Sequence, residues 1–205
     1  FKENEDLDEN AFCENIELLI NEGVYGLVVS GCTGESWALT DEDKKRIFSL
    51  AVDQANGRVV TVGGVGEATA KHTIELAGYA KDIGMDGAMI HPPARIIPSP
   101  REIITFYQEI SDAVDIPILL YNILKRQAVE LTVDLVDRLA DIENVAAIKE
   151  SSNDFERVME VIEKAGDRIQ VFTGHSAQRG VPAILLGAKG WVGSLEPQVM
   201  GKEAI

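Results

Sequence analysis

Seven short runs of apolar residues recur along the chain, and their regular spacing constrains the fold more than any other feature. The runs are almost continuously apolar rather than alternating, which is typical of parallel strands buried on both faces of a sheet. We expect strands at 26–31, 59–64, 87–91, 116–122, 145–150, 169–174 and 190–194, whose first residues lie 21 to 33 positions apart. Each interval has room for one strand and one helix.

The segments between the runs have the periodicity of amphipathic helices. The clearest one begins at Thr40, a hydroxyl N-cap followed by three acidic residues, with apolar side chains at helical spacing behind it. The same pattern predicts further helices at 10–21, 70–83, 100–113, 132–140, 154–165 and 177–186. Strands that alternate with helices in this way indicate an α/β fold with a parallel sheet.

Two architectures have this alternation, the doubly wound open sheet and the (β/α)₈ TIM barrel. The nearly equal spacing favours the barrel, and no GxGxxG motif follows the first run. Gly63-Gly-Val-Gly66 is only part of such a motif, so we interpret it as a tight barrel turn rather than a phosphate site. A barrel needs eight strands, and we therefore predict that residues 1–205 form one partial barrel domain whose first strand lies upstream of Phe1.

The charge balance limits the partners. The 205 residues carry 34 acidic and 19 basic side chains, and a formal net charge of −15 repels phosphate backbones and anionic lipids. We therefore expect neither nucleic acid nor a membrane as a partner. The two cysteines and three histidines lack the spacing of a disulfide framework or a zinc site, so we expect no metal. Because no membrane-length apolar run or signal-peptide pattern occurs, we predict a cytoplasmic protein.

One apolar run contains a lysine, and the active sites of barrels lie at the C-terminal ends of the strands. Lys149 stands near the end of the run 145–150. Burial disfavours the charged ammonium, so such a lysine tends to lose its proton, and a neutral amine attacks carbonyl carbons. The alternative is a lysine neutralised by an acid such as Glu150. Position alone favours neither interpretation over the other.

Two other strand ends carry groups that would complete this chemistry. Tyr121 lies at the end of the run 116–122, and Thr33 lies in a glycine-flanked turn whose hydroxyl and backbone amides can hold a carboxylate. Taken singly, Tyr121 is equally consistent with a core tyrosine and Thr33 with an ordinary turn residue. Together with Lys149 they supply the amine, the proton shuttle and the anion site that an imine-forming lyase needs.

The three motifs, in this order, resemble those of the pyruvate-dependent class I lyases. That family includes dihydrodipicolinate synthase, N-acetylneuraminate lyase and the 2-keto-3-deoxy-sugar-acid aldolases and dehydratases. Gly31-Cys-Thr-Gly-Glu35 is similar to the G-[TS]-T-G-E carboxylate loop of the family, Tyr121-Asn122 to its Y-N-x-P motif, and Ile148-Lys149-Glu150 to its imine-lysine strand. The resemblance covers essentially the whole chain.

The resemblance implies roles for the matching residues. Lys149 would form the imine with pyruvate or a related 2-oxo acid, and Tyr121 would relay protons. The carboxylate would bind at the loop of Cys32 and Thr33. The backbone of two further residues would line the pyruvate pocket, namely Gly174 and Val192.

The resemblance also bears on cofactors and assembly. It implies no cofactor, because the imine lysine itself serves as the electron sink. It further implies a C-terminal helical region beyond Ile205 that helps to build a homo-oligomer, a tetramer or a dimer, in the full-length protein.

Departures from the family pattern bear on the substrate. Cys32 replaces a hydroxyl residue, and because a thiol is a poor donor the hydroxyl relay is weakened or rerouted. Pro93 and Ala94 stand where the synthases carry paired tyrosines. Arg126 aligns with the arginine that binds the carboxylate of the second substrate, although a solvated loop charge is an equal interpretation. Glu196 follows the last run, where it would contact sugar hydroxyls, carry a proton or serve as a structural ion-pair partner.

We therefore expect a Schiff-base lyase, an aldolase or dehydratase that acts on a 2-oxo acid such as a 2-keto-3-deoxy sugar acid. A second hypothesis is 4-hydroxy-tetrahydrodipicolinate synthase activity in lysine biosynthesis, which Pro93 and Ala94 disfavour. A third is a barrel that binds a 2-oxo acid without catalysis. We place it last because the lysine and the tyrosine are both present.

Residues 1–205 are expected to be poorly soluble when they are produced alone. A barrel that lacks one strand leaves two open strand edges and part of its core exposed, and such edges promote aggregation. Size-exclusion chromatography and thermal melting of this segment test the expectation. A soluble monomer that melts cooperatively would contradict it.

Overall fold

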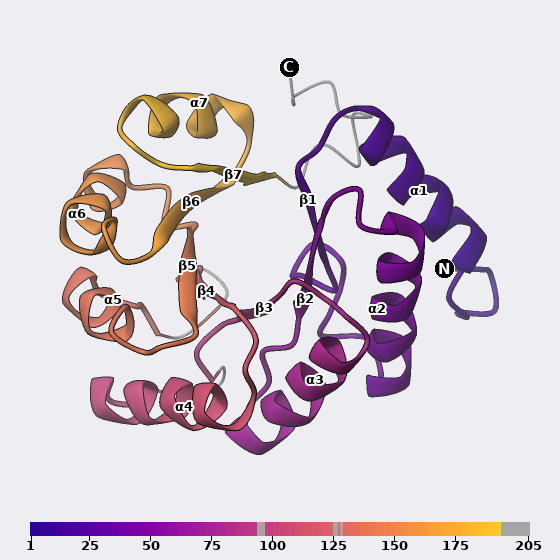
Figure 1. Cartoon of the computed structure of the whole chain (residues 1–205), viewed down its shortest axis with the longest axis horizontal. Coiled ribbons are helices and arrows are strands. Elements are labelled where there is room, and N and C mark those ends of the chain that lie inside the picture. Colours follow the sequence, from indigo (N-terminus) through magenta and orange to yellow (C-terminus); the bar gives the residue numbers. More distant parts are fainter. Residues whose placement is uncertain (94–96, 125–126, 128, 194–205) are drawn as a thin grey trace.

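The computed structural model confirms the predicted alternation of strands and helices (Figure 1). It describes residues 1–93, 97–124, 127 and 129–193. The elements follow in the order α1 (Glu9–Asn21), β1 (Gly26–Val29), α2 (Asp41–Ala55), β2 (Val60–Gly64), α3 (Ala70–Asp82), β3 (Gly87–Ile90), α4 (Pro100–Ala113), β4 (Ile118–Asn122), α5 (Val133–Leu139), β5 (Val145–Glu150), α6 (Phe155–Ala165), β6 (Gln170–His175), α7 (Ala177–Leu185) and β7 (Gly190–Gly193).

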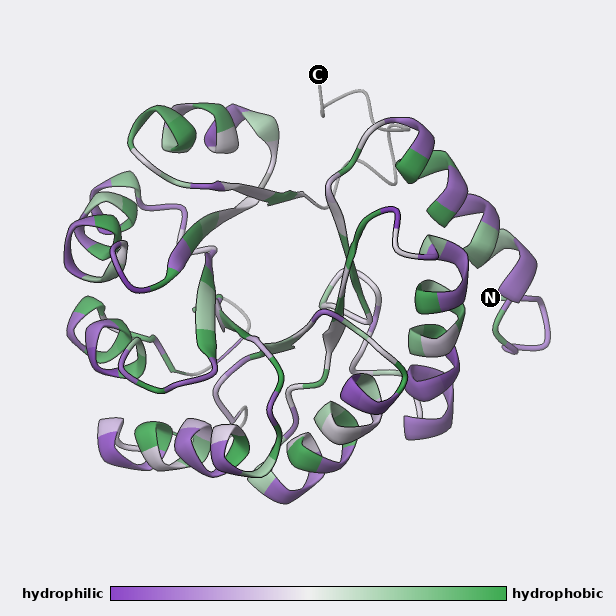
Figure 2. Ribbon diagram, in the orientation of Figure 1, coloured by the Kyte–Doolittle hydropathy of each residue, from purple (hydrophilic) through white to green (hydrophobic). Residues whose placement is uncertain are grey.

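The seven strands form one parallel sheet in which each strand pairs with the next, from β1 to β7. The sheet curves into a nearly closed ring with the helices outside it (Figure 1). Figure 2 shows that the helices turn hydrophobic residues toward the strands and hydrophilic residues outward. The fold is an incomplete (β/α)₈ barrel, as predicted, with β1 and β7 at the two edges of the sheet among the described residues.

The helices begin where the sequence places hydroxyl and carboxylate caps. The Thr40 side chain accepts a hydrogen bond from the Asp43 amide, and the Asp43 carboxylate accepts one from the Thr40 amide, which completes a capping box. Ser99 and Glu102 form the same arrangement ahead of α4. These caps satisfy amides that have no partner within a helix, so they fix the first turn of α2 and of α4.

Two strand boundaries differ from the expectation for identifiable reasons. The strand expected at 116–122 begins at Ile118 because Pro117 has no amide hydrogen to give to a ladder. The strand expected at 26–31 ends at Val29 because Ser30 adopts a left-handed conformation with φ of 55°. The chain therefore turns away from β1 two residues earlier than predicted.

Most buried apolar residues belong to two groups that lie on the two faces of the sheet, and a third, small group consists of Val158, Ala183 and Ala188. The larger group fills the space between strands and helices and includes Ile118, Leu120 and Ile148, which are fully buried. The smaller group consists of strand and strand-end residues inside the ring, among them Leu119 and Tyr121. Successive side chains on β4 thus alternate between the outer core and the barrel interior, as the period of a strand requires.

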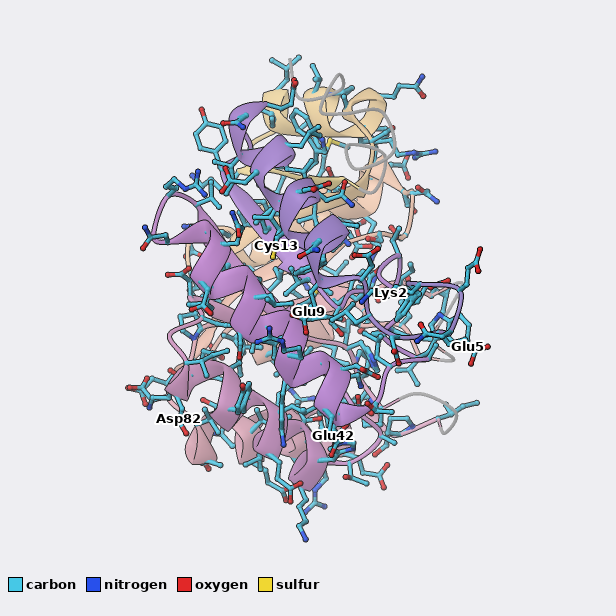
Figure 3. The ribbon with its side chains drawn as sticks, turned by 90° about the vertical axis from the view of Figure 1, so that its right-hand side faces the viewer. Lys2, Glu5, Glu9, Cys13, Glu42 and Asp82 are labelled. Atoms are coloured by element: carbon cyan, nitrogen blue, oxygen red, sulfur yellow. The ribbon has the colours of Figure 1, made fainter. Side chains whose placement is uncertain are left out.

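The helix α1 lies beside α2 on the outside of the barrel (Figure 3). Ion pairs join it to Arg46 of α2 and to Arg58, which follows α2. The Arg46 Nε donates to Glu9 at 2.7 Å, and the Arg58 guanidinium pairs with Glu17. Ile16 of α1 is buried in the outer core.

None of the helices in the described part of the chain is long and apolar enough to cross a membrane.

The glycines of the sequence 63–66 permit close approach of neighbouring backbones, although Gly63 and Gly64 belong to β2 rather than to the expected tight turn. A Cβ atom on Gly64 would overlap the carbonyl group of Ser30, with the carbonyl carbon 2.8 Å away, and one on Gly66 would lie 2.9 Å from the His91 amide nitrogen. Both contacts are with backbone atoms, which no side-chain rotation can move aside. These glycines therefore allow the backbones at the ends of β1, β2 and β3 to pack closely against one another.

Gly64→Ala is expected to destabilise the protein by about 1–3 kcal/mol, because the added methyl group forces the backbones of β1 and β2 apart. Gly78→Ala is the matched control, since no atom lies within 4 Å of its Cβ position on α3. There the substitution is expected to stabilise by about 0.5–1 kcal/mol through the helix backbone. Urea unfolding of the intact protein measures both, and equal effects would contradict the close approach.

Candidate active site

Lys149 and Tyr121 lie side by side at the C-terminal ends of two neighbouring strands. The register of β4 and β5 pairs Tyr121 with Lys149 directly, and the Lys149 Nζ lies 4.5 Å from the centroid of the Tyr121 ring. Tyr121 is 5% exposed, and Lys149 is half-buried. The face of the Tyr121 ring attracts a cation and shields the Lys149 amine from water on one side. The pairing therefore leaves this amine only partly hydrated.

The loop after β1 brings a second candidate group to the same interior. Cys32 packs against the interior apolar group that contains Tyr121, whereas Thr33 is exposed. The turn is closed by hydrogen bonds from the Glu35 amide to the Cys32 carbonyl and from the Ser36 amide to the Gly31 carbonyl, both at 3.3 Å. The amides of Thr33 and Gly34 donate to none of the residues that the structure describes, and both are available to an anion.

Gly174 and Val192 lie in direct register on β6 and β7, beyond the strand of Lys149. Gly174 is buried, and a Cβ atom there would overlap the side chain of Ser151, with its Cβ 2.8 Å away. A residue with a side chain would therefore push apart the ends of β5 and β6.

Three residues of the predicted specificity region lie outside the described part of the chain. They are Ala94, Arg126 and Glu196. Pro93 is described and is buried where the chain leaves β3. The structure therefore brings together Lys149, Tyr121 and the Cys32 loop, while the roles predicted for Arg126 and Glu196 stay predictions.

The carboxylate of Glu150 has its hydrogen-bond partners on the outer side of the sheet. It accepts bonds from Asn122 Nδ2 at 2.9 and 3.0 Å, from the Ser152 amide at 2.8 Å and from Arg157 Nε at 2.9 Å. Arg157 belongs to α6, in the helical layer. These donors satisfy Glu150 away from the barrel interior, which weakens the interpretation of Glu150 as the group that neutralises Lys149.

The same cluster holds the segment between β4 and α5. Asn122 Oδ1 accepts a hydrogen bond from the Leu131 amide at 3.0 Å, and Arg157 Nη2 donates to the Leu131 carbonyl. Arg157 Nη1 also lies 3.3 Å from a carboxylate oxygen of Glu130. We call Asn122, Glu150 and Arg157 the outer polar cluster. No local pattern singles out Arg157, because a charged residue near the start of an amphipathic helix is usually solvated.

A second buried tyrosine supports the end of β3. Tyr107 on α4 donates a hydrogen bond to the Ile90 carbonyl at 3.0 Å. Burial raises the pKa of Tyr107 well above its ordinary value, so this phenol keeps its proton and acts as a donor.

Within the residues that the structure describes, no three His, Cys, Asp or Glu side chains are grouped as metal ligands would be.

Comparisons with known proteins agree with the fold and with the order of the motifs. A model of the dihydrodipicolinate synthetase family matches residues 1–204. The 4-hydroxy-tetrahydrodipicolinate synthase of Methanothermobacter thermautotrophicus is 36% identical over 194 residues, which are 93% of this chain and 68% of that protein.

Two crystal structures show the same architecture. Dihydrodipicolinate synthase from Aquifex aeolicus has a TM-score of 0.93 and 32% identity, with 99% of this chain and 69% of that chain covered. YagE, a prophage protein from Escherichia coli K12 in complex with pyruvate, has a TM-score of 0.93 and 29% identity, with 98% and 70% covered. The barrel, the motif order and the match across nearly the whole chain lead to one conclusion: this protein belongs to the dihydrodipicolinate synthetase family, a family of lyases and synthases.

Proposed function

We propose that this protein is a Schiff-base-forming lyase that acts on pyruvate or a related 2-oxo acid, such as a 2-keto-3-deoxy sugar acid. The observation that carries the proposal is the direct pairing of Lys149 with Tyr121 at the ends of β4 and β5. An amine on a strand end inside a barrel, beside a phenol that can exchange protons, is the arrangement that imine chemistry requires.

The proposed reaction begins with attack of the neutral Lys149 amine on the C2 carbonyl carbon of the oxo acid. The carbinolamine that forms then loses its hydroxyl group as water, and the C2–nitrogen double bond of the imine is left. Tyr121 donates a proton to the departing oxygen. In C–C cleavage it then recovers a proton from the substrate hydroxyl, whose oxygen becomes the carbonyl of the released aldehyde, and the protonated imine accepts the electron pair of the broken C–C bond. In dehydration Tyr121 instead takes the C3 proton, the imine accepts the electron pair of that C–H bond, and the hydroxyl on C4 receives the proton and leaves as water with the electron pair of its C–O bond. No further cofactor takes part in the proposed reaction.

The carboxylate of the substrate is proposed to bind at the loop after β1. The amides of Thr33 and Gly34, together with the Thr33 hydroxyl, supply hydrogen-bond donors without a basic side chain. Cys32 supplies only a weak donor between this loop and Tyr121, so the proton path depends more strongly on the tyrosine. Gly174 and Val192 would line the pocket with backbone atoms. This assignment orients the C2 carbonyl toward Lys149.

Relatives support a 2-oxo acid and also give the second candidate function. YagE and the dihydrodipicolinate synthase of Acinetobacter baumannii have been crystallised with pyruvate. The name 4-hydroxy-tetrahydrodipicolinate synthase, carried by the Methanothermobacter relative, favours that activity as the alternative. The proline at position 93, in place of a tyrosine, argues for another branch of the family. We further propose a cytoplasmic homo-oligomer, a tetramer or dimer, for the intact protein.

Borohydride reduction of the intact protein in the presence of pyruvate is expected to leave a stable adduct on Lys149. Lys149→Arg keeps the positive charge but cannot form an imine, so the adduct should vanish, as peptide mass spectrometry would show. Lys44→Arg is the matched control, because Lys44 is also shielded but belongs to α2 and pairs with Glu67. A wild-type protein that forms no adduct with pyruvate or other 2-oxo acids would overturn the proposed function and favour a binding role.

Tyr121→Phe is expected to slow adduct formation by about 10²- to 10⁴-fold, because the phenol that carries the proton is lost while the ring remains. The rate of trapping at saturating pyruvate measures the effect. Tyr107→Phe is the control, since that phenol bonds the Ile90 carbonyl and lies on α4. Equal effects of the two substitutions on trapping would contradict the relay.

A further inference from the structure

We infer that the outer polar cluster of Asn122, Glu150 and Arg157 positions the amine of Lys149 and the phenol of Tyr121 for imine formation. The inference rests on the proposed function and adds residues that do not touch the substrate. Its basis is the juxtaposition of two neighbouring residue pairs, Tyr121 with Lys149 and Asn122 with Glu150, on opposite faces of the same two strand ends.

The covalent chain couples the two faces. Asn122 follows Tyr121, and Glu150 follows Lys149, so each member of the outer pair shares a peptide unit with a member of the inner pair. The Asn122 side chain bridges the two strands by donating to both carboxylate oxygens of Glu150, and the Ser151 amide donates to the Asn122 carbonyl at 2.9 Å. A planar peptide bond transmits these restraints to the next Cα, so fixing the outer side chains limits where the inner ones can point.

The cluster joins four segments that would otherwise move separately. It contains the ends of β4 and β5, the first turn of α6 through Arg157, and the residue Leu131 ahead of α5. Leu131 is held through its amide by Asn122 and through its carbonyl by Arg157. The segment between Asn122 and Leu131 links β4 to α5, so the residues at both of its ends are fixed by the cluster that restrains the strand ends.

The burial of the cluster argues for a geometric role. The Glu150 side chain is 0% exposed and that of Arg157 is 10% exposed, whereas Arg46, Arg58 and Arg168 in surface pairs are 32–51% exposed. Desolvating two charges is unfavourable, and well-packed apolar residues often replace a buried ion pair without loss of stability. Stability alone therefore does not explain why this ion pair is buried. The pair also makes directional hydrogen bonds to Asn122 Nδ2, the Ser152 amide and the Leu131 carbonyl, and these bonds define a single geometry.

The double substitution Glu150→Met with Arg157→Met separates geometry from stability. It removes both buried charges at similar volume, so the protein is expected to fold, but it releases Asn122 and Leu131 from their partners. Arg168→Met is the matched control, because Arg168 pairs with Asp137 and Asp141 after the end of α6, away from the reactive strand ends. Each variant is prepared as the intact protein and shown to unfold cooperatively before it is assayed.

The rate of borohydride-trapped adduct formation at saturating pyruvate is expected to fall by about 10- to 100-fold in the double variant and to stay unchanged in the control. Hydrogen exchange is expected to quicken in the segment 123–131 and to stay unchanged in α2, because only the cluster is altered. A folded double variant with the wild-type trapping rate would overturn the inference.

Asn122→Ala tests the same inference if the double variant fails to fold. It removes the bridge between the strands and the bond to Leu131, while the ion pair of Glu150 and Arg157 stays. Slower trapping is again expected, and a folded variant with the wild-type rate again overturns the role. A wild-type protein that forms no adduct gives a distinct result, since it removes the proposed function and, with it, any positioning role before a variant is compared.

Discussion

The hydrogen-bonded register between β4 and β5 is the constraint on which the rest of the site depends. Parallel pairing sets Tyr121 beside Lys149 and Asn122 beside Glu150. A shift of β5 by one residue would turn Lys149 and Glu150 to the opposite faces, so the lysine would enter the outer core and the glutamate the barrel interior. The hydrogen bonds of Asn122 and Arg157 to Glu150 form only in the observed register, so they stabilise this register relative to those shifted by one residue.

The two faces of these strands serve different purposes. The interior face has few polar groups and presents the amine and the phenol near a loop whose amides can receive an anion. The outer face carries the buried ion pair and the apolar contacts with the helices. The outer groups satisfy one another, so their hydrogen bonds do not involve the amine and the phenol on the interior face. This division follows from the period of a strand, in which neighbouring side chains point to opposite sides.

Much of the fold was predictable because it depends on local patterns. Apolar runs and helix caps placed the elements, and the largest errors in the strand boundaries, two residues each, arose where the missing amide of Pro117 delayed the start of β4 and the left-handed Ser30 ended β1 early. Strand-end position also singled out Lys149, Tyr121 and Thr33. Arg157 could not be selected, because its partner Glu150 lies in another element and the pairing depends on how α6 packs on the sheet. Long-range burial of this kind leaves no local pattern in the sequence.

The hydrogen bonds that hold Leu131 through its amide and its carbonyl affect which residues of this barrel can vary during evolution. The residues between Asn122 and Leu131 form a stretch whose flanking residues are held by the side chains of Asn122 and Arg157, outside the stretch itself. Substitutions within the stretch can therefore occur without the loss of these hydrogen bonds. A scaffold built in this way can keep the strand end of Tyr121 and the proposed imine lysine unchanged while the connecting residues vary.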